Sequence, residues 1–284
     1  MKRGPDGTFT ISPRKVDADP AAYLKRRRMI ELTLATLFPI LLLALLQTGS
    51  INGWWNRVFY PAPSDVWHTL HKMFTERDFS YDIWVTLKRL LYGYFFGTTI
   101  GLLAGFVLGL SRITRRTLEP TMNALYTVPK IALLSPFLIM FGFDDKPVII
   151  LVSITVFFFV WIPTQASVMG VQASFREAAT VFGANRWNAF RHVIFPATLP
   201  GIFVTLRVAA SVAILTVVGV EFVYAPEGRG LGYVINDARS TLNSGVAWAG
   251  ILVASLLGVL VTTIVKLVGR LVVPWSKEDE ASPS

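Results

Sequence analysis

The sequence predicts an all-helical integral membrane protein with about six transmembrane helices and both termini in the cytosol. Of its 284 residues, 53% are hydrophobic and only 16% are charged, whereas soluble proteins average about 25% charged residues. The windows 90–111, 147–175 and 240–265 contain no charged residue, and about 20 apolar residues are enough to cross a bilayer as a helix. Lys and Arg also collect on one side of the predicted spans, as membrane topology requires.

The predicted spans cover about residues 30–47, 84–110, 118–141, 147–169, 199–224 and 246–270. The consecutive bases Lys25 to Arg28 directly precede the first span and place the N-terminus inside. With this orientation, the inside segments hold about twice as many Lys and Arg residues as the outside ones. We therefore expect a flexible basic cytosolic tail over 1–28, a transmembrane domain over 29–275 and a second cytosolic tail over 276–284.

The outer segment 48–83 is too long for a plain loop. Its stretch 64–77 predicts a short surface helix with Ser64 as the N-cap. His68 and His71 lie three residues apart in this stretch, a spacing that can hold a metal ion. No third ligand accompanies them, so surface histidines explain the pair better and we expect no metal site.

The second predicted span carries a ladder of glycines at intervals of four: Gly93, Gly97, Gly101, Gly105 and Gly109. Small residues at this spacing let helix backbones approach closely in a membrane. Each step of four residues turns the stripe by about 40° around the helix. We therefore expect the ladder to touch more than one neighbouring helix, either within the subunit or in a second subunit.

Proline interrupts the third span at Pro129 and Pro136 and the fourth span at Pro163. Proline removes a backbone donor and kinks a helix. In lipid, such breaks persist where neighbouring groups or water satisfy the freed carbonyl groups. The predicted kinks can line a water-accessible pathway or be purely structural.

Among the ionisable residues within the predicted spans, we single out Lys130, Arg207 and Glu221. Charge inside a membrane costs at least a few kcal/mol, so such residues are candidates for function. Arg207 and Glu221 are about 21 Å apart along one helix and cannot pair directly. Glu221 is also near the outer end of its span, where water is within reach. These residues can line the pathway or form structural pairs.

Several classes of site are missing from the sequence. The chain has no cysteine, which excludes disulfides and thiolate metal sites. It contains no G-x-x-x-x-G-K-[ST] phosphate-binding loop and no H-E-x-x-H or G-x-S-x-G motif. The net charge of +9 is not gathered into a stripe that fits a nucleic-acid groove. The pattern favours a transporter or scaffold over an enzyme.

The cytosolic loop 174–196 has a helical pattern that plain membrane loops lack. Ser174 with Glu177 three residues later is the pattern of a capping box at a helix N-terminus. Ala178 and Ala179 favour continuation of that helix. Gly183 then supplies a residue that can adopt positive φ, as a helix end requires.

The second half of this loop predicts another short helix. Asn185 is a suitable N-cap, and Pro196 and Pro200 are expected to end this helix before the fifth span. Three aromatic residues give the loop apolar surface: Phe182, Trp187 and Phe190. Such a surface fits a docking site for a cytosolic partner, or an amphipathic element that rests on its own bundle or on lipid.

One sequence pattern favours docking. The run Glu177-Ala178-Ala179, three residues, Gly183, nine residues and Val193-Ile194-Phe195-Pro196 resembles the EAA motif of membrane subunits in binding-protein-dependent ABC importers. That motif normally ends in Ile-x-Leu-Pro, from which Val193 and Phe195 are conservative departures. The resemblance extends over residues 58–275 and is closest to the nitrate, sulfonate, taurine and bicarbonate branch. It includes Tyr60-Pro61-Ala62-Pro63, Thr86-Leu87-Lys88-Arg89, Val128-Pro129-Lys130-Ile131-Ala132, Phe141-Gly142, Leu206-Arg207-Val208, Gly230-Leu231-Gly232 and Pro274-Trp275.

The resemblance implies the type I ABC importer permease fold and a set of partners. The loop would be a coupling helix that contacts a separate ABC ATP-binding subunit through Glu177, Ala178, Ala179, Gly183, Trp187 and Pro196. ATP and Mg would bind to that subunit, and no cofactor to this chain. A second copy of the permease, an external or periplasmic solute-binding protein and the lipid of the bacterial cytoplasmic (inner) membrane would complete the assembly.

The implied function is transport of a small solute. The branch suggests an anion such as nitrate, a sulfonate, taurine or bicarbonate, and Lys130 and Arg207 would suit it electrostatically. The alternatives are a self-contained secondary transporter and a membrane enzyme or scaffold. No inverted repeat of broken spans supports the secondary transporter, and no catalytic motif supports the enzyme.

Overall fold

The structure is a computed structural model that describes residues 2–3, 9–10, 20–76 and 78–275. The chain divides into two compact units, Met1–Asp65 and Val66–Ser284. The first contains a short antiparallel pair, β1 (Lys2–Arg3) with β2 (Phe9–Thr10), and the helix α2 (Pro20–Ile51). The rest of the predicted tails, residues 1, 4–8, 11–19 and 276–284, lies outside the described residues.

Helix α2 confirms the first predicted span and extends it in both directions. It begins at Pro20 and so includes residues 20–28, which the sequence assigned to the tail. From Lys25 onward it is apolar and long enough to cross a membrane, and its leucines are exposed within the unit. In a bilayer, such a surface faces lipid.

The predicted surface helix is α3 (Pro63–Glu76), at the boundary of the two units. Ser64 is not its N-cap, because the helix starts one residue earlier and Ser64 lies inside it. The Asp65 carboxylate instead accepts from the Ala62 N–H at 3.3 Å and forms an ion pair with Arg57 at 2.8 Å. These contacts close the first turn of α3.

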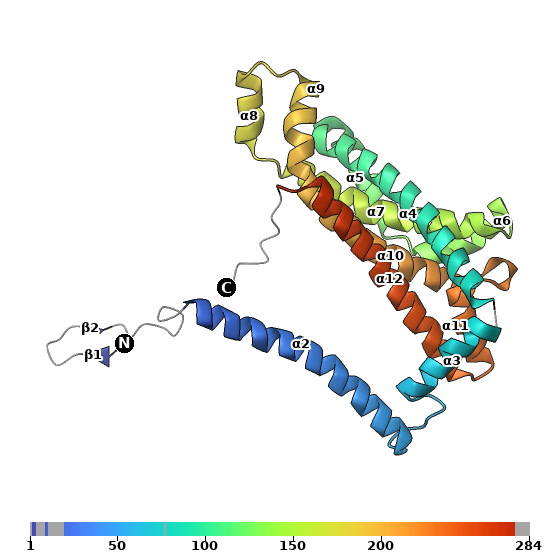
Figure 1. Ribbon diagram of the computed structural model, residues 1–284. Coiled ribbons are helices and arrows are strands. Elements are labelled where there is room, and N and C mark those ends of the chain that lie inside the picture. Colours follow the sequence, from blue (N-terminus) through green and yellow to red (C-terminus); the bar gives the residue numbers. More distant parts are fainter. Residues whose placement is uncertain (1, 4–8, 11–19, 77, 276–284) are drawn as a thin grey trace. The chain divides into compact units, whose positions relative to one another are not determined.

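The second unit is a helical bundle (Figure 1). Its elements are α4 (Phe79–Leu110), α5 (Arg112–Tyr126), η1 (Lys130–Leu133), α6 (Leu134–Phe141), α7 (Asp145–Met169), α8 (Ala173–Val181), α9 (Arg186–Ala189), η2 (Phe190–Ile194), α10 (Phe195–Val223), η3 (Pro226–Gly228), α11 (Leu231–Ser240) and α12 (Ser244–Val272). In the described part of the chain, five helices are long and apolar enough to cross a membrane, or six spans if one bent pair counts as a span. The predicted fold class is confirmed.

All five glycines of the ladder on α4 face α7. The atoms nearest to a Cβ built at these positions belong to Val152, Ser153, Val156, Phe157, Val160, Trp161, Thr164, Gln165 and Val168. Within this chain, α7 is thus the nearest neighbour of every glycine of the ladder, and contact with a second subunit stays a prediction. On α4 and on α7, the contacting residues recur every four residues. Each row of contacts therefore shifts gradually around its own helix, in the same way on both helices. The two helices stay in contact because they wrap around each other.

The third predicted span is not a continuous helix. It consists of α5 and the pair η1–α6, which are bent by 86° relative to each other. Pro129 occupies this break, in an extended conformation just before η1. Pro136 lies within α6, and α7 continues through Pro163. Of the three predicted kinks, only the one at Pro129 interrupts a span.

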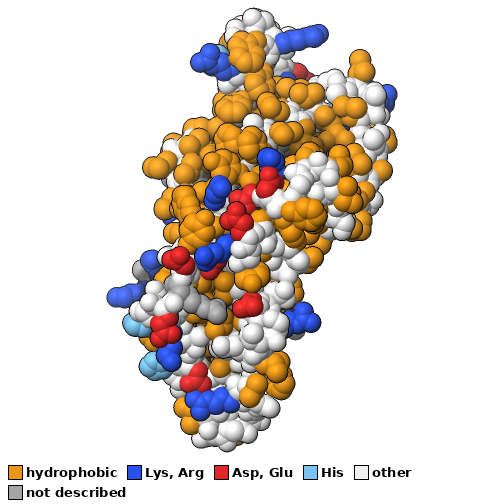
Figure 2. Space-filling model, turned by 90° about the vertical axis from the view of Figure 1, so that its right-hand side faces the viewer, with side chains coloured by type: hydrophobic (Ala, Val, Ile, Leu, Met, Phe, Trp, Pro, Cys, Tyr) orange, Lys and Arg blue, Asp and Glu red, His pale blue; other side chains and the backbone are white. Residues whose placement is uncertain are grey.

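The core of the second unit is formed by small and β-branched side chains. On α10, the fully buried residues Ala209, Ala210, Ala213, Val217 and Val220 lie on one side of the helix. Their small size allows close packing, which replaces the hydrophobic effect as the force that holds helices together in lipid. Large apolar side chains remain on the outside, and Figure 2 shows them over much of the visible face, with charged side chains in groups.

Candidate functional site

The loop singled out by the sequence forms α8 and α9, which project from one end of the bundle (Figure 1). The predicted capping box is wrong, because α8 begins at Ala173 and Ser174 is already inside it. Gln172 occupies the N-cap position and makes no side-chain bond there. A different contact holds α8: the guanidinium of Arg176 donates at 2.6 Å to the carbonyl of Val168, in the last turn of α7.

The end of α8 is a Schellman turn. The N–H of Ala184 donates to the carbonyl of Ala179 at 2.9 Å, and the N–H of Gly183 donates to that of Thr180 at 3.0 Å. Gly183 has φ +74°, as the C′ position of this motif requires. The predicted positive φ is confirmed, and the turn fixes the direction in which α8 projects.

The helix that follows starts as predicted but does not stop. The Asn185 side chain caps α9 by accepting from the Asn188 N–H at 2.8 Å. Pro196 and Pro200 were expected to end this helix, and that expectation is wrong, because residues Arg186–Val223 run on as one helical stretch. The π-helical turn η2 precedes Pro196, and within it the Phe195 N–H donates to the carbonyl of Phe190. This wider turn accommodates the proline without ending the helix.

The exposed surface of the loop includes an apolar tip. Val181 and Phe182 are 84% and 89% exposed, and Trp187 is 64% exposed. Glu177 and Ala178 are exposed beside them, whereas Ala179 is buried. Phe190 does not contribute to this surface, because its ring packs against Phe106 of α4 and Phe195. The loop thus offers a short helix with an apolar tip and one carboxylate.

A buried ionic network lies at the other end of α7. The Glu221 side chain on α10 is 0% exposed, so the suggestion that it reaches water is wrong. Its carboxylate accepts from the Thr86 hydroxyl at 2.8 Å, the Arg89 guanidinium at 2.8 Å and the Gly232 N–H at 3.1 Å. Glu221 thus forms an ion pair within the chain.

Arg89 is the centre of this network. Its guanidinium bonds Glu221 and also Asp145 at the start of α7, at 2.8 Å in both cases. It donates in addition to the backbone carbonyls of Arg229 at 2.8 Å and Pro226 at 3.4 Å. The side chain is 1% exposed. A buried charge is tolerated when its partners and hydrogen bonds are complete, which is the case for this residue.

The segment between α10 and α11 is bound to α4 through its backbone. The Asp82 carboxylate accepts from the Gly230 N–H at 3.1 Å, and the Thr86 hydroxyl accepts from the Leu231 N–H at 2.8 Å. A Cβ at Gly230 or Gly232 would come within 2.6 Å or less of Glu221 or of the α10 backbone. The glycines therefore allow this segment to lie directly on the network.

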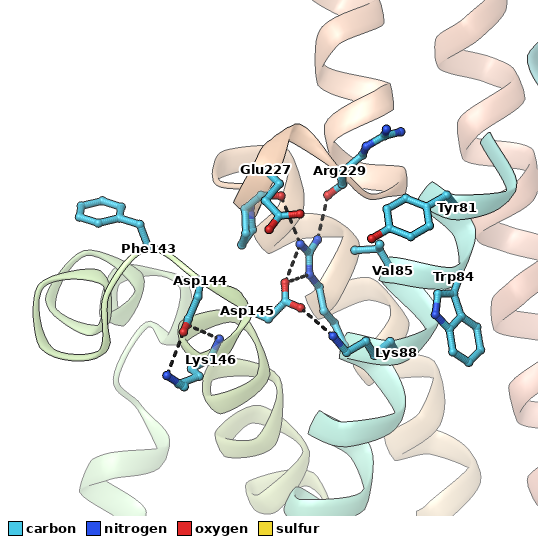
Figure 3. A pocket seen from close by; sticks show the side chains of 12 residues that line it. Tyr81, Trp84, Val85, Lys88, Phe143, Asp144, Asp145, Lys146, Glu227 and Arg229 are labelled. Atoms are coloured by element: carbon cyan, nitrogen blue, oxygen red, sulfur yellow. Dashed lines mark hydrogen bonds and ion pairs between the residues drawn. The ribbon is translucent and has the colours of Figure 1, made fainter. Parts of the chain in front are cut away.

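A cavity of about 450 Å³ opens beside the network. Figure 3 shows its walls, with side chains from the start of α4, the start of α7 and the segment before α11. Lys88 pairs with Asp145 at 3.3 Å, and Lys146 pairs with Asp144 at 2.9 Å. The hydrogen bond from Lys146 holds the pKa of Asp144 below its usual range, so this carboxylate is ionised at neutral pH.

Lys130 and Arg207, the two basic residues singled out within the predicted spans, are not part of this network. Lys130 lies at the break between α5 and η1, where its ammonium group donates to the carbonyl of Tyr126. It also lies 4.6 Å from the ring centre of Tyr126 and 5.1 Å from that of Phe158. A cation at the C-terminal end of a helix is favourable, and Lys130 lies at such an end, just after α5. Arg207 is half-buried on α10.

Sequence reasoning missed the α4 residues that bind Glu221 and the segment before α11. Asp82, Thr86 and Arg89 occupy positions i, i+4 and i+7 on α4, which places them on one face of the helix. This polar stripe is visible in the sequence. Arg89 lies near the start of the predicted span 84–110, and the structure shows that it is buried.

Among the residues that the structure describes, no group of three or more His, Asp or Glu side chains is placed to hold a metal ion. His68 and His71 lie on α3.

Comparison with known proteins places these features in a family. The sequence model described as "Binding-protein-dependent transport system inner membrane component" matches residues 97–277. The putative aliphatic sulfonates transport permease protein SsuC of Bacillus subtilis is 29% identical over 244 residues, which cover 86% of this chain and 88% of SsuC. The taurine transport system permease protein TauC of Escherichia coli is 29% identical over 241 residues, covering 80% of this chain and 87% of TauC.

Two further comparisons extend this picture. The nitrate import permease protein NrtB of Synechococcus elongatus is 29% identical over 206 residues, covering 72% of this chain and 73% of NrtB. Among solved structures, an inward-facing MetNI methionine ABC transporter matches with a TM-score of 0.55 at 21% identity, covering 67% of this chain and 92% of that one. The structural match shows that the fold is shared.

Proposed function

The chain belongs to the binding-protein-dependent transport system inner membrane components, and we propose that it carries a small anion in an ATP-driven importer. The relatives named for aliphatic sulfonates, taurine and nitrate support a solute with an oxyanion group, because all three solutes contain negatively charged oxygen atoms at neutral pH. Lys130 and Arg207 are the proposed pathway charges, since a cation within the membrane attracts an anion. Glu221 is already bound to Arg89 and is not proposed as a contact of the solute.

The energy for transport is proposed to come from a separate ATP-binding subunit that docks on the loop 174–196. The observation that carries this proposal is the apolar tip of α8, where Val181 and Phe182 are exposed beside Glu177. An exposed apolar patch on a projecting helix is typical of a protein–protein contact. ATP and Mg would bind to that subunit, and this chain would supply no cofactor site.

The proposed docking residues all belong to the loop 174–196, where some are exposed and others fix its shape. Glu177 and Ala178 lie on the exposed side of α8, and Ala179 and Gly183 form the turn that ends it. Trp187 lies on α9, and Pro196 lies in the first turn of α10. Since Arg176 bonds the end of α7, movement of the docked loop would be transmitted to α7 directly.

The remaining partners follow from the family. We propose that the α8–α9 end faces the cytosol of a bacterium, across the cytoplasmic membrane, and that a solute-binding protein docks at the opposite end. A second copy of the chain is expected to pack at the apolar groove of about 530 Å³ between α10 and α12. Small residues in this groove, Ser211, Ser255 and Gly258, allow close approach of another helix.

The docking proposal is tested by Gly183→Asp and Glu177→Lys. Both variants are expected to insert normally but to lose co-purification with the ATP-binding subunit and at least 90% of solute uptake. Aspartate at Gly183 adds a charged side chain to the turn at the docking surface. Lysine at Glu177 replaces the only carboxylate of the loop with a positive charge. Uptake in proteoliposomes and pull-down of the ATP-binding subunit are the measurements.

Gly53→Asp is the matched control. Gly53 has φ +73°, against +74° for Gly183, and a Cβ meets nothing within 4 Å at either position. The two substitutions therefore impose the same backbone strain, but Gly53 is outside the loop. Equal uptake in the two glycine variants would show that the loop is not the docking site.

A further inference from the structure

We propose that Glu227 is the residue on which a basic side chain of the external solute-binding protein docks, at the mouth of the cavity beside the ionic network. This inference rests on the proposed function, because it needs a solute-binding protein as a partner. Its four arguments are the rigidity of the segment, the backbone of Glu227, the charge balance of the cavity and the location.

Buried side chains of α4 hold the segment that carries Glu227 in place. The carbonyls of Pro226 and Arg229 accept from Arg89, on either side of Glu227. The following N–H groups of Gly230 and Leu231 donate to side chains of α4. A loop fixed at so many points loses little conformational entropy on binding, which favours affinity.

The backbone of Glu227 is strained. Its φ of +59° and ψ of 12° place it in the left-handed region, where a side chain other than glycine costs on the order of 1 kcal/mol. The side chain is exposed, and it makes no ion pair or side-chain hydrogen bond with any residue of the described chain. Glutamate at this position therefore contributes nothing to the fold that glycine would not, and a contact with another molecule explains it better.

Among the charged side chains that line the cavity, Glu227 has no oppositely charged partner in the described chain. Each basic side chain of the wall has an acidic partner within the chain: Lys88 with Asp145, Lys146 with Asp144, Arg89 with Glu221 and Arg229 with Asp82. The group without an internal partner is thus a carboxylate, which attracts a cation and repels anionic lipid. Figure 3 shows Glu227 and Arg229 on the same segment with their side chains diverging, so Arg229 does not cover the carboxylate.

The surroundings fit a protein partner. Trp84 and Phe143, which also line the cavity, are 57% and 75% exposed. Aromatic residues next to a charge are typical of the residues that dominate binding at protein interfaces. The cavity lies at the N-terminal end of α7, whereas α8 follows its C-terminal end, about 37 Å away for a helix of this length. The site is therefore on the face opposite to the proposed ATP-binding subunit.

The test uses the complete transporter in nanodiscs, with the permease, its ATP-binding subunit and solute-loaded binding protein. The binding-protein concentration that gives half-maximal stimulation of ATP hydrolysis is expected to rise about threefold or more for Glu227→Gln and at least tenfold for Glu227→Lys. Salt should weaken stimulation of the wild type more than that of Glu227→Gln, because the variant lacks the charge. Glu76→Gln, which neutralises an exposed carboxylate at the end of α3 away from the cavity wall, is the control and is expected to match the wild type.

A second variant separates docking from folding. Glu227→Gly removes the strain and the charge together, so the thermal midpoint is expected to stay or rise while the half-saturating concentration increases. A structural role of Glu227 would lower the thermal midpoint instead. The proposal therefore predicts that the half-saturating concentration increases without a fall in the thermal midpoint.

A third measurement identifies the partner. The sequence contains no cysteine, so Glu227→Cys can be labelled at one position with a photocrosslinker before reconstitution. Crosslinks to the binding protein support the proposal, whereas crosslinks to lipid alone overturn it, as does a half-saturating concentration of Glu227→Lys within twofold of the wild type. If the binding protein does not stimulate even the wild type, the proposed function fails as well.

Discussion

Replacing Arg89 with methionine is expected to lower the free energy of unfolding of the second unit by about 3–5 kcal/mol, as is usual when one partner of a buried ion pair is removed. The substitution leaves the carboxylate of Glu221, which is 0% exposed, without its cation. It also removes the donors to the carbonyls of Arg229 and Pro226. A neutral side chain of similar length cannot replace any of these bonds.

The measurement is the thermal midpoint in detergent, followed by size-exclusion chromatography after heating. Lys88→Met is the matched control, because Lys88 is the preceding residue and pairs with the same Asp145. Its side chain is 45% exposed, and exposed pairs contribute about 0–1 kcal/mol. Equal midpoints for the two variants would contradict the central role of Arg89.

A double variant shows which lost interaction lowers the stability of Arg89→Met. In Arg89→Met with Glu221→Gln, no uncompensated charge remains at Glu221, and the amide can still bond Thr86 and Gly232. We expect this double variant to be more stable than Arg89→Met alone. If it is less stable by the sum of the two single effects, the pair does not act as a unit.

The substitution Gly97→Ala is expected to destabilise the contact between α4 and α7 by about 1–3 kcal/mol, the usual cost of overpacking a core. The new Cβ would lie 2.5 Å from the carbonyl oxygen of Ser153 and 2.7 Å from the Cβ of Val156. A backbone oxygen cannot rotate away as a flexible side chain can. The two helices would have to separate over the length of the ladder.

Two other alanine substitutions calibrate this result. At Gly219 on α10, a Cβ meets nothing within 4 Å, so alanine is expected to be neutral or to stabilise by up to about 1 kcal/mol through helix propensity. At Gly101 the nearest atom is 2.9 Å away, so the cost is expected to be smaller than at Gly97. Thermal midpoints in the order Gly219→Ala, Gly101→Ala, Gly97→Ala, from highest to lowest, support the packing described. Any other order argues against it.

The sequence predicted the spans well because hydrophobic length depends on each segment alone. Contacts between segments were harder to predict. The glycine ladder indicated close helix packing, but nothing in it indicates that α7 is the partner at all five positions. Glu221 was recognised as unusual, yet Arg89 lies 132 residues away in the chain, and no local pattern links the two.

In the loop 174–196 as well, the sequence predicted local features better than features that depend on contacts with other segments. Gly183 and Asn185 were predicted correctly because each acts on its own neighbours, through backbone conformation and through a cap. Ser174 was misplaced because the start of α8 depends on where α7 ends and on the contact of Arg176. Pro196 was read as a stop, since the sequence gives no sign of the π-helical turn before it.

The buried network also has a consequence for biogenesis. Arg89 and Glu221 are separated by 132 residues, which a ribosome translates in about 7–26 s at roughly 5–20 residues per second. During this interval α4 is already inserted, and Asp145, 56 residues after Arg89, is the first acidic partner to emerge. Membrane insertion of α10 then brings the Glu221 carboxylate to Arg89, so we expect this end of the bundle to assemble in the order of synthesis.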